Sequence, residues 1–110
     1  MEQSITLTES TYYVLLALVK PQHGYGIMQQ VAELSCGRVT LAAGTLYGAL
    51  NALCAKKWIE PLPVQEGERK KEYCITQTGR AVLEAELLRL KELVKNGSLI
   101  LGNQENQIEG

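Results

Sequence analysis

The apolar positions between residues 42 and 58 predict an amphipathic helix. One stripe of that helix holds apolar side chains at spacing i, i+3, i+4, i+7 and i+8, namely Leu46, Ala49, Leu50, Leu53 and Cys54. The opposite side holds small, uncharged residues, namely Gly44, Thr45, Gly48, Asn51, Ala52 and Ala55. A helix surface that faces water usually carries Lys and Glu. The pattern therefore predicts a helix that buries one face in the protein and lays the other against a partner.

The chain before this stretch predicts a first helix that is buried on more than one side. Residues 8–11 can cap it, and the run 12–19 is apolar nearly all round. Pro21 ends the helix because proline cannot continue it, and Gly24 permits the turn that follows.

A second amphipathic helix is expected from about Tyr25 to Leu34, with Gly37 as the left-handed residue that ends it. Thr40 stands in the short link that follows and is placed to cap the helix of residues 42–58. Two helices joined in this way give the outline of a helix-turn-helix, with a longer linker than the tightest forms have.

Two short strands are expected after these helices. Apolar residues recur over 59–64 and again over 73–75, and Gly67 marks the turn between the two runs. The prolines of the first run confine it to an edge or bulged position. A hairpin directly after such a helix is a wing. Its base or tip carries a basic triplet that could reach phosphates or could simply be a solvated strand end: Arg69, Lys70 and Lys71.

A long helix is expected from about Gln77 to Lys95, capped by Thr76 or Thr78 and rich in strong helix formers. Its apolar seam repeats every three or four residues, through Leu83, Leu87, Leu90 and Val94. Such a seam predicts a surface that pairs with a second copy of the chain, and covering the domain's own core is the alternative.

Together these elements predict a mainly helical α+β fold, a winged helix-turn-helix with a two-stranded wing and a long C-terminal dimerisation helix. The expected divisions are a DNA-binding domain over residues 1–76, a dimerisation helix over 77–96, and a polar, disordered tail over 97–110.

The length and net charge of the chain are compatible with the predicted fold but add little support for it. A chain of 110 residues fits one small domain, and 45% hydrophobic residues suffice for a core. The net charge of −1 and the pI of about 5.8 mean that a basic patch for nucleic acid would have to be local. No run approaches the ~20 apolar residues of a membrane span, and residues 1–10 do not resemble a signal peptide. We expect a cytoplasmic protein.

The sequence carries no signature of an enzyme, a cofactor site or a metal site. It has no aspartate, no glycine-rich phosphate loop and a single histidine, His23. A solvated helix face explains its clustered acids better than acid–base chemistry does: Glu84, Glu86 and Glu92.

The three cysteines are too few and too far apart for a disulfide framework or a metal site. We expect Cys54 and Cys74 to be small buried hydrophobic residues. Cys36 lies beside a glycine in a turn and is expected to be more exposed, which leaves a thiol sensor as the alternative for that residue.

DNA is the partner that best fits the helix of residues 42–58. A major groove about 12 Å wide admits one helix, and small side chains permit close approach to the base edges. Hydroxyl groups, lysines and arginines then fix the register through phosphates. The candidates on and before this helix are Thr40, Thr45, Tyr47, Gly48 and Asn51. Tyr47 flanks the apolar stripe and could instead belong to the core.

Three segments occur in order within about residues 12–90: HGYGIMQQV, GTLYGALNALCAKKWIE and ERKKEYCITQTGRAVLEAEL. They resemble the PadR family of bacterial transcriptional regulators, in its short branch with one C-terminal helix. The resemblance implies a winged-helix homodimer that represses transcription by binding a palindromic operator. It implies a dimer interface made by the C-terminal and first helices. In some members an aromatic or phenolic small-molecule effector binds there or nearby and releases the protein from DNA.

The resemblance also assigns residues to DNA binding. Tyr47 matches the near-invariant tyrosine of the recognition helix, and Tyr25 with Gly26 matches the start of the second helix. The wing strand is matched by Lys70, Lys71 and Tyr73.

This chain departs from the family pattern in two places. Asn51 and Ala52 stand where a basic residue is common, and Glu66, Glu68 and Glu72 interrupt the positive charge of the wing. Both departures predict weaker, more salt-sensitive contact with phosphates or a narrower operator preference.

The sequence allows alternatives for both the partner and the regulation of the protein. The neutral helix face and the acidic pI keep a second function in play, a winged-helix protein–protein interaction module without direct DNA binding. The last predicted helix has no tryptophan or tyrosine, so an aromatic cage for an effector is not evident there. Tyr12 and Tyr13 of the first helix could line an interfacial effector pocket instead.

Overall fold

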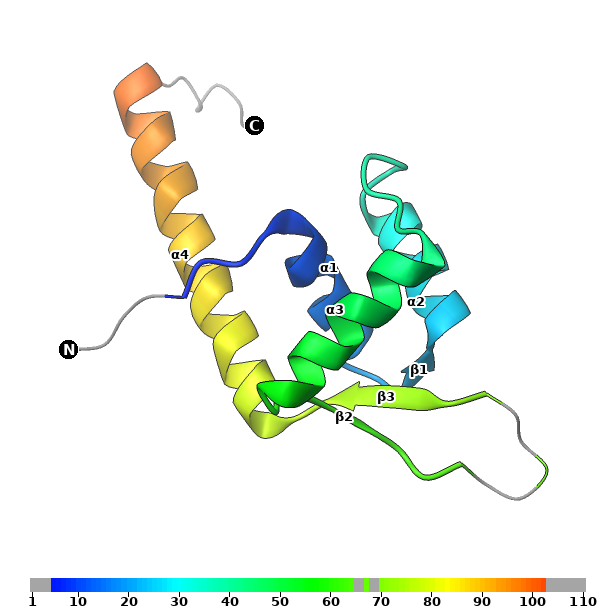
Figure 1. Ribbon diagram of the computed structural model, residues 1–110. Helices are drawn as coiled ribbons and strands as arrows, with labels where there is room; N and C mark the ends of the chain where they lie inside the picture. The colour runs from blue at the N-terminus through cyan, green and yellow to red at the C-terminus, as the bar shows by residue number, and fades with distance from the viewer. Residues whose placement is uncertain (1–4, 65–66, 68–69, 103–110) are drawn as a thin grey trace.

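Helices dominate the structure, and the strands are short. The computed structural model describes residues 5–64, 67 and 70–102. Within these ranges the elements follow in the order α1 (Glu9–Ala17), β1 (Gln22–His23), α2 (Gly24–Leu34), α3 (Ala43–Ala55), β2 (Ile59–Pro61), β3 (Glu72–Ile75) and α4 (Gln77–Leu101) (Figure 1). The mainly helical α+β fold predicted from the sequence is confirmed.

The strands form one antiparallel sheet in the order β1-β3-β2, along the lower edge of the helices in Figure 1. β3 pairs with β2 through Ile75 opposite Ile59 and with β1 through Tyr73 opposite Gln22. The sequence predicted a two-stranded wing, so the third strand is a correction. β1 has only two residues, too few to show an alternating pattern.

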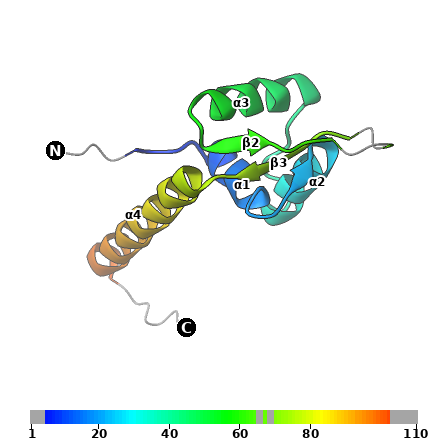
Figure 2. The ribbon, with the colours of Figure 1, turned by 90° about the horizontal axis from the view of Figure 1, so that it is seen from below.

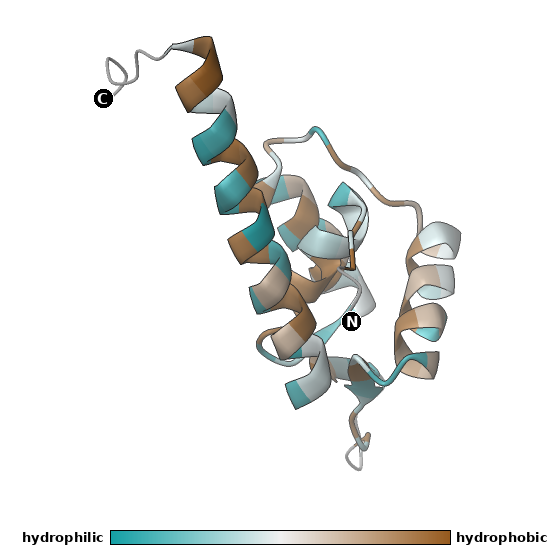
Figure 3. Ribbon diagram, turned by 90° about the vertical axis from the view of Figure 1, so that its left-hand side faces the viewer, coloured by the Kyte–Doolittle hydropathy of each residue, from teal (hydrophilic) through white to brown (hydrophobic). Residues whose placement is uncertain are grey.

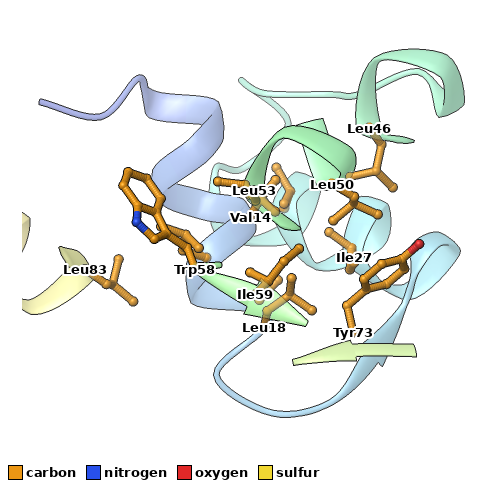
Figure 4. Packing of buried hydrophobic residues seen from close by; sticks show 13 residues of the cluster. Val14, Leu18, Ile27, Leu46, Leu50, Leu53, Trp58, Ile59, Tyr73 and Leu83 are labelled. Carbon is orange, nitrogen blue, oxygen red and sulfur yellow. The ribbon is translucent and has the colours of Figure 1, made fainter. Parts of the chain in front are cut away.

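The core lies where α1, α2 and α3 meet the sheet (Figure 4). α1 buries Val14, Leu15 and Ala17, which agrees with the prediction that this helix is covered on more than one side. The other helices and strands contribute the rest of the buried cluster, namely Leu18, Ile27, Val31, Leu46, Leu50, Leu53, Trp58, Ile59, Tyr73 and Leu83. The only tryptophan of the chain is therefore a packing residue.

Three helices begin with a side-chain cap, and α3 does not. Thr8, His23 and Thr76 accept the N–H of the residue three positions on, at 3.0 to 3.1 Å. α3 has Ala42 at its N-cap position without a side-chain hydrogen bond. The prediction that Thr40 caps this helix is wrong, because the helix begins too late for that hydroxyl to reach it.

α4 leaves the domain and projects well beyond it (Figures 1 and 2). The helix runs to Leu101, so the predicted division at residue 96 is wrong by more than a turn. Gly102 ends it in the left-handed conformation. The remainder of the predicted tail, residues 103–110, lies outside the described residues. In the described part of the chain, no helix combines the length and the apolar character that crossing a membrane requires.

Candidate nucleic-acid interface

α3 presents an exposed face of small, uncharged side chains. Leu46, Leu50 and Leu53 are buried against the core. On the other side, the exposed residues are Ala43, Gly44, Thr45, Tyr47, Gly48, Asn51, Ala52 and Ala55. The space outside Gly44 and Gly48 is open to 4 Å from an added Cβ. The division into a buried apolar face and a smooth outer face, predicted from the periodicity alone, is confirmed, and α3 lies along one outer side of the domain (Figure 2).

Tyr47 belongs both to the packing and to the surface. Its side chain is 45% exposed, yet its hydroxyl lies against Gly24, the first residue of α2. A Cβ at Gly24 would overlap that hydroxyl, so the glycine permits the close approach of α3 to the start of α2. The sequence analysis did not identify Gly24 as part of this site.

Tyr73 lies in the core rather than on the predicted DNA-binding surface. Only 7% of it is exposed, and burial raises the pKa of its hydroxyl, with smaller contributions from Cys54 and Tyr47. The prediction that Tyr73 contacts DNA directly does not fit this burial. Its ring instead supports Lys71, whose ammonium group lies 5.8 Å from the ring centroid.

The described basic residues of the wing are exposed. Lys70 and Lys71 form no salt bridge with any described residue. Arg69, the third member of the predicted triplet, lies outside the described residues, as do Glu66 and Glu68. Glu72 is half-buried at the start of β3. The wing therefore offers two exposed ammonium groups that form no salt bridge with a described residue.

The other predicted contacts occupy exposed positions around α3. Tyr25 is 63% exposed at the start of α2, and Thr40 is exposed ahead of α3. At the C-terminal end of α3, Lys56 is exposed and its ammonium group lies 4.9 Å from the ring centroid of Trp58. Lys56 lines a hollow of about 250 Å³ between α3 and the arm, which we define as residues 5–8. The sequence shows Lys56 beside a second lysine, but no role was predicted for it.

The predicted dimerisation seam divides into two parts. Leu83 is 6% exposed and packs into the core of its own domain, so the alternative reading holds for this residue. Leu90 is half-buried, while Leu87 and Val94 are 42% and 68% exposed. Beyond the domain the helix carries further exposed apolar residues (Figure 3), namely Leu88, Leu93, Leu99, Ile100 and Leu101.

Tyr12 and Tyr13, the predicted effector residues, are half-buried and pack against the core. Their rings meet edge to face, with centroids 6.2 Å apart. Neither tyrosine lines the hollow beside Ala81 and Ala85, the hollow between α3 and the arm, or the hollow beside Pro21.

The cysteines are free and lie apart. Cys36 is exposed, as expected, while Cys54 and Cys74 are half-buried rather than fully buried. Burial raises the pKa of the Cys54 thiol, and the nearby Lys71 opposes that effect. Among the described residues, no three side chains of the metal-binding types lie close enough together to hold an ion.

Comparisons with known proteins agree with this geometry. Residues 14–85 match the transcriptional regulator PadR-like family. A protein of 37.1 kDa in transposon TN4556 of Streptomyces fradiae, itself uncharacterised, is 43% identical over 74 residues, which are 66% of this chain. The chain spans only about a fifth of that relative's length, since the match covers 20% of it.

Solved structures show the same fold. A PadR family regulator from Clostridium difficile R20291 superimposes with a TM-score of 0.69 at 28% identity, over 86% of this chain and 98% of that one. A PadR family regulator from Eggerthella lenta DSM 2243 gives a TM-score of 0.70 at 22% identity, over 86% and 82% of the two chains. With its winged helix-turn-helix, its family match and these neighbours, the chain belongs to the PadR-like family of transcriptional regulators.

Proposed function

We propose that the protein is a transcriptional repressor that binds a palindromic operator as a homodimer, with α3 in the major groove and the wing on the phosphates. The observation that carries this proposal is the juxtaposition of two surfaces. The exposed face of α3 is small and uncharged, and the wing beside it carries ammonium groups that form no salt bridge with any described residue.

The two surfaces suit different parts of a DNA duplex. Gly44 and Gly48 leave open space outside α3, which allows its backbone to come close to the base edges. Thr45 and Asn51 are exposed on the same helix and can hydrogen-bond to bases or phosphates. Lys70 and Lys71 then supply the charge that α3 lacks, so the phosphate contacts fall to the wing.

A second copy of the chain completes the proposal. The outer part of α4 exposes large apolar residues, which isolated domains rarely leave in water as a continuous stripe. Pairing this stripe with that of a second chain places two α3 helices about a two-fold axis. An operator with two half-sites about one helical turn apart, ~34 Å, matches such a dimer.

Reversing the charge of the wing tests the DNA-binding proposal. We expect Lys70→Glu with Lys71→Glu to abolish the mobility shift of the protein's own promoter fragment, because like charges then face the phosphates. The matched control is Lys20→Glu with Lys95→Glu, since both residues are exposed and lie outside the wing, α3 and the seam of α4 that holds Leu87 and Val94. The control should bind as the wild type does, and both variants should remain dimers.

The contrary result identifies the alternative function. If the wing variant binds DNA unchanged, the wing assignment is wrong. If the wild-type chain binds no genomic fragment even at low salt and co-purifies with one protein partner, the winged helix is a protein–protein interaction module.

We include release by an aromatic or phenolic effector in the proposal, which rests on the family membership, and Tyr12 and Tyr13 are the candidate residues. A panel of phenolic and cationic aromatic compounds is titrated against intrinsic fluorescence, which Trp58 dominates. A saturable change with loss of the DNA shift supports an effector site, and no response from any compound contradicts it.

A further inference from the structure

Glu86 is a buried carboxylate on a helix where the sequence predicted a solvated one. Its side chain is 2% exposed, in contrast to Glu84 on the same helix, which is 65% exposed. It accepts the backbone N–H of Leu7 at 3.2 Å, and Arg89 donates to both of its oxygens at 2.8 and 2.7 Å. Glu86 therefore joins α4 to the arm, which leads directly into the cap of α1.

Glu86 is also the last buried residue of α4. The buried positions of the helix are Gly79, Leu83 and Glu86, one on each successive turn. Gly79 is in contact with the main chain immediately before β2, because a Cβ there would overlap the carbonyl oxygen of Trp58. α4 is thus held to the domain at its base by Gly79 and, two turns further on, by Glu86.

Packing between the arm and α4 is incomplete around this link. A hollow of about 290 Å³ lies between Ile5 of the arm and the small side chains of Ala81 and Ala85. A second hollow, of about 250 Å³, separates the arm from α3. Because these hollows leave the packing around the arm partly open, the hydrogen bonds of Glu86 add a restraint on the angle of α4 to the one that Leu83 provides in the core.

A small change in the angle of α4 displaces the far end of the helix by a large distance. The 15 residues that follow Glu86, as far as Leu101, correspond to roughly 22 Å of helix. A tilt of about 10° at Glu86 would move the far end by about 4 Å, slightly more than the ~3.4 Å rise of one base pair. Small changes at the link therefore matter to anything that α4 positions.

We propose that Glu86 is a positioning residue that fixes the direction of α4 relative to α3 and thereby sets the spacing of the two half-sites that the dimer accepts. The part that concerns half-sites rests on the proposed function. The part that concerns the direction of α4 rests on the buried link alone.

The energetics of buried ion pairs favour a geometric role over a stabilising one. Desolvation largely offsets the attraction in such pairs, and apolar residues of similar size often replace them without loss of stability. Glu86→Met removes both hydrogen-bonding links without leaving a buried charge, and Arg89, 28% exposed, can turn toward water. This variant should fold as stably as the wild type and yet lose the fixed angle.

Distances within one chain test the direction of α4 without DNA. Nitroxide labels are placed on Cys36, which is exposed, and on Lys95→Cys, in a chain whose other two cysteines are replaced by alanine. Labelled protein is diluted into unlabelled protein so that pulsed electron paramagnetic resonance measures distances only between two labels on the same chain. The unaltered link should give a narrow distance distribution, and Glu86→Met and Glu86→Gln should each at least double its width.

Glu84→Gln is the matched control, since it removes an exposed carboxylate from the same helix by the same substitution. It should leave the distribution unchanged. A distribution as narrow in folded Glu86→Met as in the wild type overturns the inference. Should Glu86→Gln fail to fold, Glu86→Met still decides it.

DNA binding tests the second part. Duplexes carry the palindrome that the wild-type chain selects from random DNA, with one or two base pairs added to or removed from its centre. Each added pair rotates one half-site by roughly 35°, and we expect the wild type to lose roughly tenfold in affinity for each. Glu86→Met should lose no more than about threefold while binding a single half-site as the wild type does.

Failure of the role in half-site spacing and failure of the proposed function give different results. Equal spacing penalties in Glu86→Met and the wild type overturn the role in half-site spacing. Absence of any DNA binding by the wild type contradicts the proposed function instead, and the label distances then still decide whether Glu86 fixes the direction of α4.

Discussion

The outer face of α3 and the outer part of α4 are both exposed surfaces of amphipathic helices, and they differ in kind. Apart from Tyr47, α3 exposes glycine, alanine, threonine and asparagine, whereas the outer part of α4 exposes leucine, isoleucine and valine. Small side chains leave the backbone accessible to a rigid partner with its own hydrogen-bonding groups, as the edges of base pairs are. Large apolar side chains gain free energy only when a complementary apolar surface covers them.

The difference shows that amphipathicity alone does not identify the partner of a helix. In the proposed function, the size and polarity of the exposed residues separate a surface for DNA from a surface for a second copy of the chain. Substitutions test this distinction, either by changing the character of one surface or by disturbing a contact that positions the helix.

The largest effect is expected where charge enters the apolar stripe of α4. Leu87→Glu with Val94→Glu should raise the dissociation constant of the dimer roughly a hundredfold or more, because each apolar side chain contributes about 1.5–3 kcal/mol when buried and a two-fold interface contains every site twice. Analytical ultracentrifugation measures the change. Both residues are exposed in the single chain, so the fold should survive.

Leu88→Glu with Leu99→Glu is the matched control for the dimer. Both leucines are 67% exposed on α4, but the helical period places them on another side of the helix from Leu87 and Val94. The control should remain dimeric. Dissociation of the control together with an intact dimer in the first variant would place the interface on the opposite side of α4.

A methyl group at Gly24 should disturb the support of α3. Gly24→Ala would overlap the hydroxyl of Tyr47, and overpacking of this kind typically costs about 1–3 kcal/mol. Urea unfolding measures the loss, and the affinity for DNA should fall with it. Tyr47→Ala in the same chain removes the obstructing ring and should restore part of the stability, whereas no difference between Gly24→Ala and the wild type would contradict the contact.

A methyl group at Gly48 should have the opposite effect on stability. Nothing lies within 4 Å of an added Cβ there, so Gly48→Ala should stabilise α3 by up to about 1 kcal/mol through helix propensity. If the outer face of α3 approaches base edges, the same methyl group should lower the affinity for DNA by roughly tenfold. Urea unfolding and a mobility shift measure the two effects, and a more stable variant with unchanged DNA affinity would argue against close approach at Gly48.

Local patterns in the sequence were sufficient to predict most of the fold. The two faces of α3 follow from a 3.6-residue period, and the caps at Thr8 and Thr76 follow from residue type beside an apolar run. The left-handed Gly37 was predicted on the same basis. Each of these features depends on interactions within a few residues, which a single sequence displays directly.

The features that the sequence did not predict depend on distant pairs. β1 exists because it pairs with β3, about 50 residues later, and Gly24 matters because Tyr47 reaches it. Tyr73 matched a family position for DNA contact, but its burial depends on which side of β3 faces α3. The position of Glu86 in the sequence does indicate burial, because the residue stands three after Leu83 and four before Leu90, within the apolar seam.

The smallest effect is expected at Glu86, where α4 passes from the core to the exposed stripe. Hydrogen bonds from Arg89, opposed by burial and assisted by the N–H of Leu7, hold the pKa of this carboxyl below its ordinary value of 4.5. A group with a depressed pKa in the folded state stabilises the fold above its unfolded-state pKa. That stabilisation is lost as the pH falls through the lower value of the folded state, because the unfolded chain takes up the proton first.

The wild type should therefore be more stable than Glu86→Gln at pH 7, and the difference should shrink as the pH falls below about 4.5. Urea unfolding of both proteins in steps from neutral to acidic pH measures it. A difference that stays constant or grows on acidification would show that the carboxylate is not held in its charged form by Arg89. The link between α4 and the arm would then depend on packing alone, and the boundary between the core part and the exposed part of α4 would not be set by Glu86.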